Sequence, residues 1–184
     1  PENIALLCDA SQRVTGEPLI AGNAVTPLDS GEEAYPVMLE AIRGAKQCIA
    51  MSSYIFRNDA AGGEFADALI EAAGRGVKVR VLLDSIGAGY FCPLILYRMR
   101  AGGVACARFL HIWLPWRMPF LNMRNHRKVL VVDGHLAFTG GMNVGAENLA
   151  RCVGKRAIRD THFRVTGPVV RVVMDAFATR TTGP

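Results

Sequence analysis

Residues 126–143 read HRKVLVVDGHLAFTGGMN, and this stretch contains two apolar runs separated by a turn signal. The first run, 129–132, is apolar without interruption, which is typical of a central strand covered on both faces. The second run covers 135–138, and the Asp133-Gly134 pair between the runs is a strong signal for a two-residue hairpin turn. The stretch therefore predicts a β-hairpin whose first strand lies inside a sheet.

Helix and strand patterns alternate on both sides of this hairpin. Apolar residues at helical spacing predict helices, and short alternating or continuous apolar runs predict strands. The predicted helices cover 32–46, 64–74, 94–101 and 169–178, and the other predicted strands cover 23–28, 47–56, 77–83, 104–110 and 162–165. The residue pairs at 58–59 and 62–63 read as breaks ahead of the second helix. Strands separated by helices indicate an α/β layered domain.

Length and composition favour a single folded domain. The chain has 184 residues, of which 51% are hydrophobic and 20% charged. This is enough for one core of ordinary size and too apolar for a disordered chain. We expect an N-terminal extension at 1–22, one domain at 23–179 and a C-terminal tail at 180–184 that marks a truncation point. The chain begins at Pro1 rather than Met, which favours a piece of a longer protein. No apolar run reaches 18 residues, so we expect the chain itself to be soluble.

The charge of the chain suits an anionic partner. The formal net charge is +5, and arginine supplies most of it. The anionic partners that fit are phosphate, nucleic acid and an acidic membrane surface. The alternative is that the basic residues only form a solvated surface. No block of consecutive basic residues occurs, which argues against a dedicated nucleic-acid tail.

Patterns for metal binding are weak. The five cysteines are widely spaced without a C-x-x-C pair, so they favour neither a zinc module nor a disulfide framework. Asp133, His135, Asp160 and His162 match no familiar set of metal ligands. We therefore expect no metal and no cofactor.

The polar residues around the hairpin suit phosphodiester chemistry. His126 and Lys128 lie two residues apart, so on a strand they point to the same face. A neutral imidazole can supply a nucleophile there, and the ammonium can neutralise charge on phosphoryl oxygens. Gly140 and Gly141 allow backbone N–H groups to approach an anion, and Asn143 adds a side-chain donor. The structural alternatives are a solvated strand edge, a loop hinge and a helix N-cap.

The segment 111–125, HIWLPWRMPFLNMRN, is unusually apolar for a connection. It holds Trp113, Trp116 and Phe120, and its two prolines oppose a regular element. One interpretation is a plug against the core or against a partner half. The other is an acyl-chain wall or a loop at a membrane interface.

The joint pattern H-x-K-x4-D-x6-G-G-x-N resembles the signature motif of the phospholipase D superfamily. Many members have Ser at the position of Gly141, and a Gly-Gly pair resembles the bacterial cardiolipin synthase branch, in particular the N-terminal half of such a protein. Further similar segments are TPL at 26–28, EEAY at 32–35, SSYIF at 52–56, LPWR at 114–117, NHRK at 125–128 and FRVTGP at 163–168. The resemblance covers about 23–178 and implies a phospholipase D-like domain with a central mixed β-sheet flanked by helices.

The resemblance also implies a two-step mechanism. His126 would attack phosphorus and form a phosphohistidine, while Lys128, Asn143 and the Gly141 amide hold the phosphoryl oxygens. Asp160 occupies the place of the acid that orients the nucleophilic histidine in the family. Asp133 belongs to the motif, and we expect it to act in the hairpin turn.

A second motif is missing from the chain. The other histidines, His111, His135 and His162, have no Lys two residues later. The family uses two motifs, so this chain would supply half of an active site. The second half would come from the same parent chain or from a second copy.

Three hypotheses for the function follow. The leading one is a phosphatidyltransferase half-domain that acts on phospholipid at an anionic membrane surface, on the cytoplasmic face of the membrane for the parent protein. The second is a homodimeric nuclease of the same family, although nucleic acid is the less favoured partner because the Trp-containing segment is so apolar. The third is an inert half that needs its partner.

Overall fold

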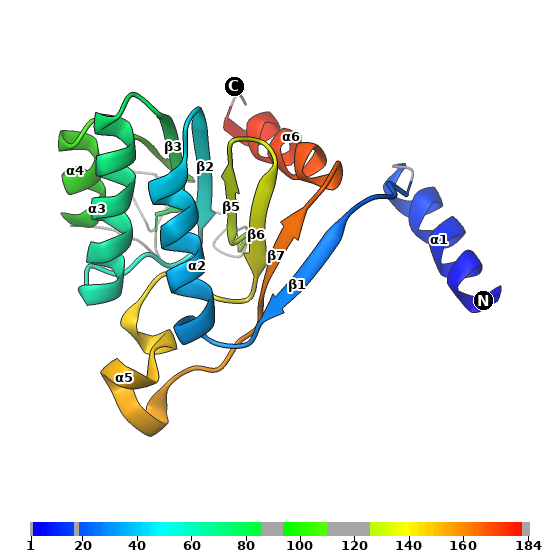
Figure 1. Ribbon diagram of the computed structural model, residues 1–184, viewed down its shortest axis with the longest axis horizontal. Helices are drawn as coiled ribbons and strands as arrows, with labels where there is room; N and C mark the ends of the chain where they lie inside the picture. Colours follow the sequence, from blue (N-terminus) through cyan, green and yellow to red (C-terminus); the bar gives the residue numbers. More distant parts are fainter. Residues whose placement is uncertain (1, 17–18, 86–93, 110–125, 182–184) are drawn as a thin grey trace, which may run out of the picture.

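The computed structural model describes residues 2–16, 19–85, 94–109 and 126–181, and these form a seven-stranded sheet with helices on both faces (Figure 1). The strands are β1 Ala24–Leu28, β2 Cys48–Ser53, β3 Lys78–Asp84, β4 Ala105–Phe109, β5 Val129–Val132, β6 Leu136–Gly140 and β7 His162–Thr166. The helices are α1 Glu2–Thr15, α2 Gly31–Gly44, α3 Ala60–Gly74, α4 Leu94–Ala101, α5 Ala150–Val153 and α6 Val169–Thr181. The strand order is β1-β7-β6-β5-β2-β3-β4.

The sheet is mixed, as the resemblance implies. β2, β3 and β4 run parallel, whereas β5, β6, β7 and β1 continue from β2 in antiparallel order. The expected α/β fold with a central mixed sheet flanked by helices is confirmed.

The hairpin predicted from 126–143 joins β5 to β6. Asp133 and Gly134 both have positive φ, 50° and 69°. Val132 pairs with Leu136, so His135 also belongs to the turn, which has three residues instead of the predicted two.

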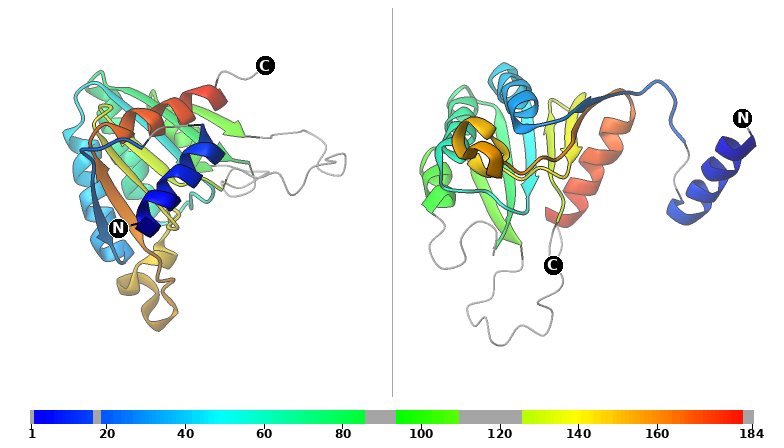
Figure 2. Two further views of the ribbon diagram at one scale, coloured as in Figure 1. Left: turned by 90° about the vertical axis from the view of Figure 1, so that its right-hand side faces the viewer. Right: turned by 90° about the horizontal axis from the view of Figure 1, so that it is seen from below.

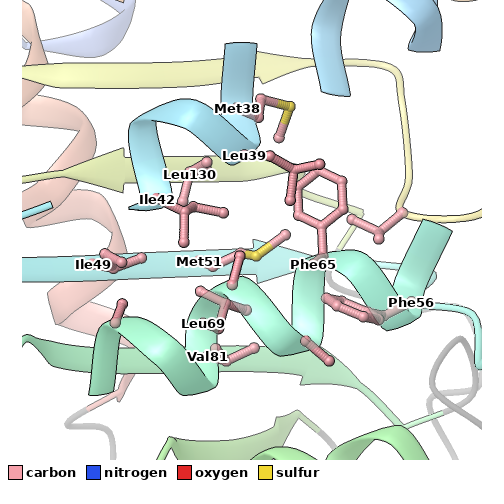
Figure 3. Close-up of a cluster of buried hydrophobic side chains, with 14 of the residues drawn as sticks. Met38, Leu39, Ile42, Ile49, Met51, Phe56, Phe65, Leu69, Val81 and Leu130 are labelled. Carbon is pink, nitrogen blue, oxygen red and sulfur yellow. The ribbon is translucent and has the colours of Figure 1, made fainter. Parts of the chain in front are cut away.

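Two separate cores cover the two faces of β5. Leu130 packs into the larger core beneath α2, α3 and α4 (Figure 3), and Val131 packs into the smaller core beneath α6. Both side chains are fully buried. This alternation confirms that the uninterrupted apolar run is a central strand with no solvent-facing side.

The start of α3 differs from the prediction. Gly62 and Gly63 lie in the first turn of the helix instead of breaking the chain before it. Asp59 caps the helix, because its carboxylate accepts a hydrogen bond from the Gly62 N–H at 2.9 Å. A Cβ at residue 62 would overlap the Arg57 carbonyl oxygen, so the glycine serves a close approach of the chain.

Helix α1 lies apart from the sheet (Figures 1 and 2). Its described side chains include the exposed Leu6, Leu7 and Val14. Neither α1 nor the short helical turns between 146 and 156 were predicted from the sequence. Within the described ranges, no helix has the length and apolarity needed to cross a membrane.

Candidate phosphoryl-transfer site

The motif residues gather at one edge of the sheet because of the strand directions. Ser52 near the end of β2 pairs with Val129 at the start of β5. Gly140 at the end of β6 pairs with His162 at the start of β7. The segments before β5, after β2, after β6 and before β7 therefore meet at this edge.

His126 stacks on Tyr54, the residue that directly follows β2. The ring centroids are 4.0 Å apart and the ring planes differ by 22°. Lys128 Nζ lies 5.6 Å from the centroid of the same Tyr54 ring and donates to the His126 carbonyl oxygen at 3.0 Å. The imidazole and the ammonium thus share one aromatic neighbour.

Lys128 is partly desolvated. Burial lowers the pKa of Lys128 below its ordinary value, while the negative charge of Asp160 acts in the opposite direction. Its backbone is fixed to β6, since Thr139 Oγ1 donates to the Lys128 carbonyl oxygen at 3.0 Å. An ammonium that is partly desolvated and carried by a strand is well suited to bind an anion.

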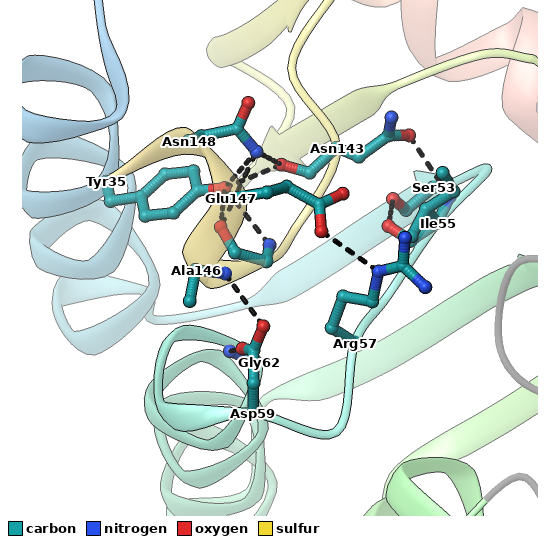
Figure 4. Close-up of polar contacts among 11 residues, drawn as sticks. Tyr35, Ser53, Ile55, Arg57, Asp59, Gly62, Asn143, Ala146, Glu147 and Asn148 are labelled. Atoms are coloured by element: carbon teal, nitrogen blue, oxygen red, sulfur yellow. Dashed lines mark hydrogen bonds and ion pairs between the residues drawn. The ribbon is translucent and has the colours of Figure 1, made fainter. Parts of the chain in front are cut away.

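Asn143 is held at both its side chain and its backbone (Figure 4). Its Oδ1 accepts a hydrogen bond from the Ile55 N–H at 3.1 Å, so the two N–H groups of Nδ2 are its remaining donors. Its carbonyl oxygen accepts from the Tyr35 hydroxyl at 2.7 Å and from Asn148 Nδ2 at 3.3 Å.

The Tyr35 hydroxyl organises the segment that follows Asn143. Besides donating to this segment, it accepts from the Gly145 N–H at 3.1 Å and from Asn148 Nδ2 at 2.9 Å. Burial raises the pKa of Tyr35 to about 12, so the hydroxyl keeps its proton. Its one donor and two acceptor positions are all used by the same segment.

The loop after β2 clamps this segment from a second side. Ala146 N–H donates to Asp59 Oδ2 at 2.8 Å, and Arg57 Nε pairs with Glu147 Oε2 at 3.0 Å (Figure 4). Helix α2 and the loop after β2 therefore fix the position of Asn143 together.

The glycine pair makes room for neighbours. A Cβ at Gly140 would lie 2.5 Å from the Thr161 carbonyl oxygen, and a Cβ at Gly141 would overlap the Asp160 carboxylate. The Gly141 N–H already donates to the Thr161 carbonyl oxygen at 3.2 Å. This differs from the expectation that the Gly141 amide binds a phosphoryl oxygen, because the strand pairing of β6 and β7 extends to that amide.

Asp160 lies beside Gly141, and Thr161 N–H donates to its Oδ1 at 2.8 Å. Among the described residues, no hydrogen bond joins Asp160 to His126. Its charge nevertheless acts on both Lys128 and His162.

His162 is a buried histidine at the site that was not chosen as a site residue from the sequence. It is 1% exposed, and its Nδ1 has no hydrogen-bond partner among the described residues. The pKa of His162 is lowered to about 4, mainly by burial; the charge of Asp160 acts to raise it, and the charge of Lys128 adds to the lowering. His162, Lys128 and Asn143 line one small cavity of about 10 Å³ at this edge.

Asp133 lies away from this group. Asp133 directly follows the four-residue strand β5 and Lys128 directly precedes it, and a separation of five positions in an extended chain spans about 16 Å. Its carboxylate accepts from the backbone N–H groups of Lys46, Gln47 and Cys48 at 2.8–2.9 Å. Burial acts to raise its pKa, but these hydrogen bonds outweigh burial and hold the pKa below its ordinary value. The geometry gives Asp133 a bracing function between the hairpin and the α2–β2 turn.

The apolar segment with Trp113, Trp116 and Phe120 lies outside the described residues.

Comparison with known proteins places these features in one family. The family described as "Cardiolipin synthase, PLD-like domain" matches residues 38–158. The chain is 39% identical over 166 residues to cardiolipin synthase A of Pseudomonas aeruginosa, covering 90% of this chain and 34% of that protein. It is 36% identical over 161 residues to cardiolipin synthase 1 of Bacillus anthracis, covering 88% and 32%. The chain thus spans about a third of the length of these relatives.

The fold also matches a solved structure. The phospholipase D family member Nuc from Salmonella typhimurium superimposes with a TM-score of 0.66 at 21% identity, covering 87% of this chain and 95% of that one. The family match over 38–158 and the identities of 36% and 39% to curated relatives point to the same family as the fold. The cluster of polar motif residues at one end of the strands agrees with this assignment. The chain belongs to the cardiolipin synthase family of phospholipase D-like domains.

Proposed function

We propose that this chain is a phosphatidyltransferase domain of the cardiolipin synthase type, which transfers a phosphatidyl group through His126. The observation that carries the proposal is the convergence of His126, Lys128 and Asn143 at one edge of the sheet, in a chain whose curated relatives are cardiolipin synthases.

In the proposed first step, a ring nitrogen of His126 attacks phosphorus. An N–P bond forms, the P–O bond to the first alcohol breaks, and the electron pair leaves on the alcohol oxygen. A histidine of a second motif-bearing half gives that oxygen its proton. In the second step, the same histidine takes the proton of an acceptor alcohol as its oxygen attacks phosphorus, and the N–P bond breaks with its electron pair returning to His126.

Lys128 and Asn143 are the proposed phosphoryl-oxygen ligands. The ammonium is fixed beside the His126 backbone at 3.0 Å, and the Asn143 amide is oriented through Ile55. Fixed donors of this kind require little reorganisation when charge develops on phosphorus oxygens. We propose that Gly140 and Gly141 contribute space rather than amide donors.

Asp160 is proposed as the acid that orients His126, as the resemblance implies. This role requires the Asp160 carboxylate and the His126 ring to come within hydrogen-bonding distance of each other. An acid on the far ring nitrogen fixes the tautomer and stabilises the imidazolium.

The proposed partners are phospholipid, an anionic membrane surface at its cytoplasmic face, and a second motif-bearing half. The relatives are about three times as long as the matched region, which leaves room for a second half in the same chain. The Trp-containing segment is proposed to contact lipid.

The test supplies this chain with a second motif-bearing half and measures glycerol release from phosphatidylglycerol vesicles. Activity is expected, and His126→Ala should reduce it about 10⁴-fold because the nucleophile is lost. His135→Ala is the matched control, since that histidine is exposed in the hairpin turn. Absence of lipid turnover, or a His126→Ala variant as active as the control, would refute the proposal.

The second candidate is a homodimeric nuclease. Two observations favour it: this chain covers 95% of the phospholipase D family member from Salmonella typhimurium, and its net charge is +5. This alternative predicts a dimer by light scattering and metal-independent DNA cleavage; a monomer without cleavage eliminates it.

A further inference from the structure

We propose that Tyr54 is a catalytic residue whose aromatic face stabilises the positive charge that develops on the His126 ring as the N–P bond forms. The inference rests on the proposed function, because it concerns the same nucleophile. Tyr54 lies outside the motif, in the SSYIF segment at 52–56, for which the sequence analysis gave no function.

The geometry places Tyr54 against both charged partners of the reaction. Its ring lies 4.0 Å from the His126 ring, centroid to centroid, and nearly parallel to it at 22°. Lys128 Nζ lies 5.6 Å from the same centroid, within the range of a cation–π contact. Tyr54 therefore touches the reacting ring itself.

The backbone around Tyr54 is held on both sides. Ser53 Oγ donates to the Ile55 carbonyl oxygen at 2.7 Å, and Ile55 N–H donates to Asn143 Oδ1 at 3.1 Å. Phe56, one residue later, is 1% exposed and forms a β-bridge with Val144. The ring thus stands on a fixed segment that is joined directly to the proposed phosphate ligand.

The charge on the imidazole changes during the reaction. The neutral ring carries one N–H, and its other nitrogen uses a lone pair to form the N–P bond. The ring then carries a positive charge, while the electron pair of the broken P–O bond leaves with the alcohol. A cation is attracted to an aromatic face more strongly than a neutral ring is. The contact therefore strengthens toward the transition state, which raises kcat rather than substrate affinity.

The stack also restricts the plane of the His126 ring. His126 is exposed and directly follows the undescribed segment 110–125. The parallel Tyr54 ring is the described side chain that confines it, so the nucleophile is held closer to one orientation before substrate arrives.

The experiment compares Tyr54→Leu and Tyr54→Phe in the chain supplied with a second motif-bearing half. Tyr54→Leu removes the aromatic face and should reduce kcat about 5- to 30-fold with little change in KM. Tyr54→Phe keeps the face and should stay within about threefold of the parent. Tyr97→Leu makes the same replacement at an exposed site on α4 and serves as the control.

A second measurement excludes a purely structural effect. Phenylalanines with increasing numbers of ring fluorines at position 54 preserve the ring shape but weaken the attraction for cations, so kcat should fall with each fluorine. In the 184-residue chain, the His126 ring protons should show an upfield NMR shift that disappears in Tyr54→Leu.

The outcomes separate the two proposals. An inactive parent refutes the proposed function and the inference with it. An active parent that loses activity in His126→Ala but tolerates Tyr54→Leu as well as Tyr97→Leu overturns the inference alone. The inference is also overturned if kcat stays the same as the number of fluorines on the ring at position 54 increases.

Discussion

Gly141 is the residue whose small size the candidate site uses most directly. The Asp160 carboxylate lies where a Cβ of residue 141 would stand, and Asp160 in turn acts on the charge of Lys128. The Gly-Gly variant of the motif therefore has a local explanation. Any larger residue at position 141 would clash with the Asp160 carboxylate where it now lies.

Gly141→Ala should displace Asp160 and reduce phosphatidyl transfer at least about tenfold, because overpacking at a crowded site forces neighbours to move. Enzyme assay together with thermal unfolding measures this. Gly44→Ala is the control, since a Cβ at Gly44 meets nothing within 4 Å. Equal activity of the two variants would contradict the account of Gly141.

Tyr54 and His162 show why single residues escaped the sequence analysis. Tyr54 lies 72 positions before His126 in the chain, and their contact depends on the pairing of β2 with β5. His162 reaches the site through its pairing with Gly140. Neither the Tyr54–His126 contact nor the His162–Gly140 pairing can be predicted from the spacing of residues within one segment. The hairpin and the H-x-K spacing are local, so they were predictable.

At the scale of elements, the segment from Asn143 to Asn148 depends on helix α2. The Tyr35 hydroxyl fills its hydrogen-bonding capacity with this segment, and its ring packs edge-to-face on Phe65 at 5.1 Å. The helix itself was predictable from its apolar spacing. The role of its tyrosine was not, because the partner segment is more than 100 residues away.

Tyr35→Phe should keep the ring contact with Phe65 while leaving buried polar groups of the Asn143–Asn148 segment without a partner. We expect a loss of about 1–3 kcal/mol in the free energy of unfolding, measured with urea. Transfer activity should fall as well, because Asn143 loses its anchor. Tyr97→Phe, an exposed tyrosine, should change neither quantity. A Tyr35→Phe variant that matches this control would show that Asn143 is held without the hydroxyl.

The two glycines in the first turn of α3 illustrate an error at the same scale. Consecutive glycines usually interrupt a helix, because they lose the most backbone freedom on folding. Here the Asp59 cap and the tight approach of Gly62 to Arg57 outweigh that cost. Such a compensation arises from contacts that only the folded chain makes.

For the whole molecule, the burial of His162 predicts a component of acid sensitivity. Its folded pKa of about 4 lies below the ordinary value of 6.5, so the unfolded chain binds a proton that the folded chain does not. The contribution of His162 to the free energy of unfolding is fully present above about pH 6.5. It falls by about 3 kcal/mol in total as the pH is lowered toward 4.

Urea unfolding between pH 4 and 7 measures this dependence. His162→Gln removes the titrating group, so the free energy of unfolding should change less with pH between pH 4 and 7. His135→Gln changes an exposed histidine and should leave the slope in place. An unaltered slope in His162→Gln would show that other groups carry the acid sensitivity.

The architecture as a whole was largely predictable, because the alternation of helix and strand patterns is a property of each segment. The strand order was not predictable from segments alone, since it places β5 between β2 and β6 and joins β1 to β7 at the edge. Helix α1 was missed, and its described large apolar side chains, Leu6, Leu7 and Val14, are exposed instead of forming a buried stripe of the kind that the sequence analysis searched for.

The position of β5 between two cores has a consequence for the order in which the protein opens. Leu130 and Val131 are fully buried on opposite faces, so loss of either core alone leaves the strand covered by the other. Backbone amides of β5 therefore exchange with solvent deuterium only when both layers separate, later than those of the edge strands. The segment carrying His126 and Lys128 is thus joined to a strand that we expect to stay closed when only one of the two layers opens.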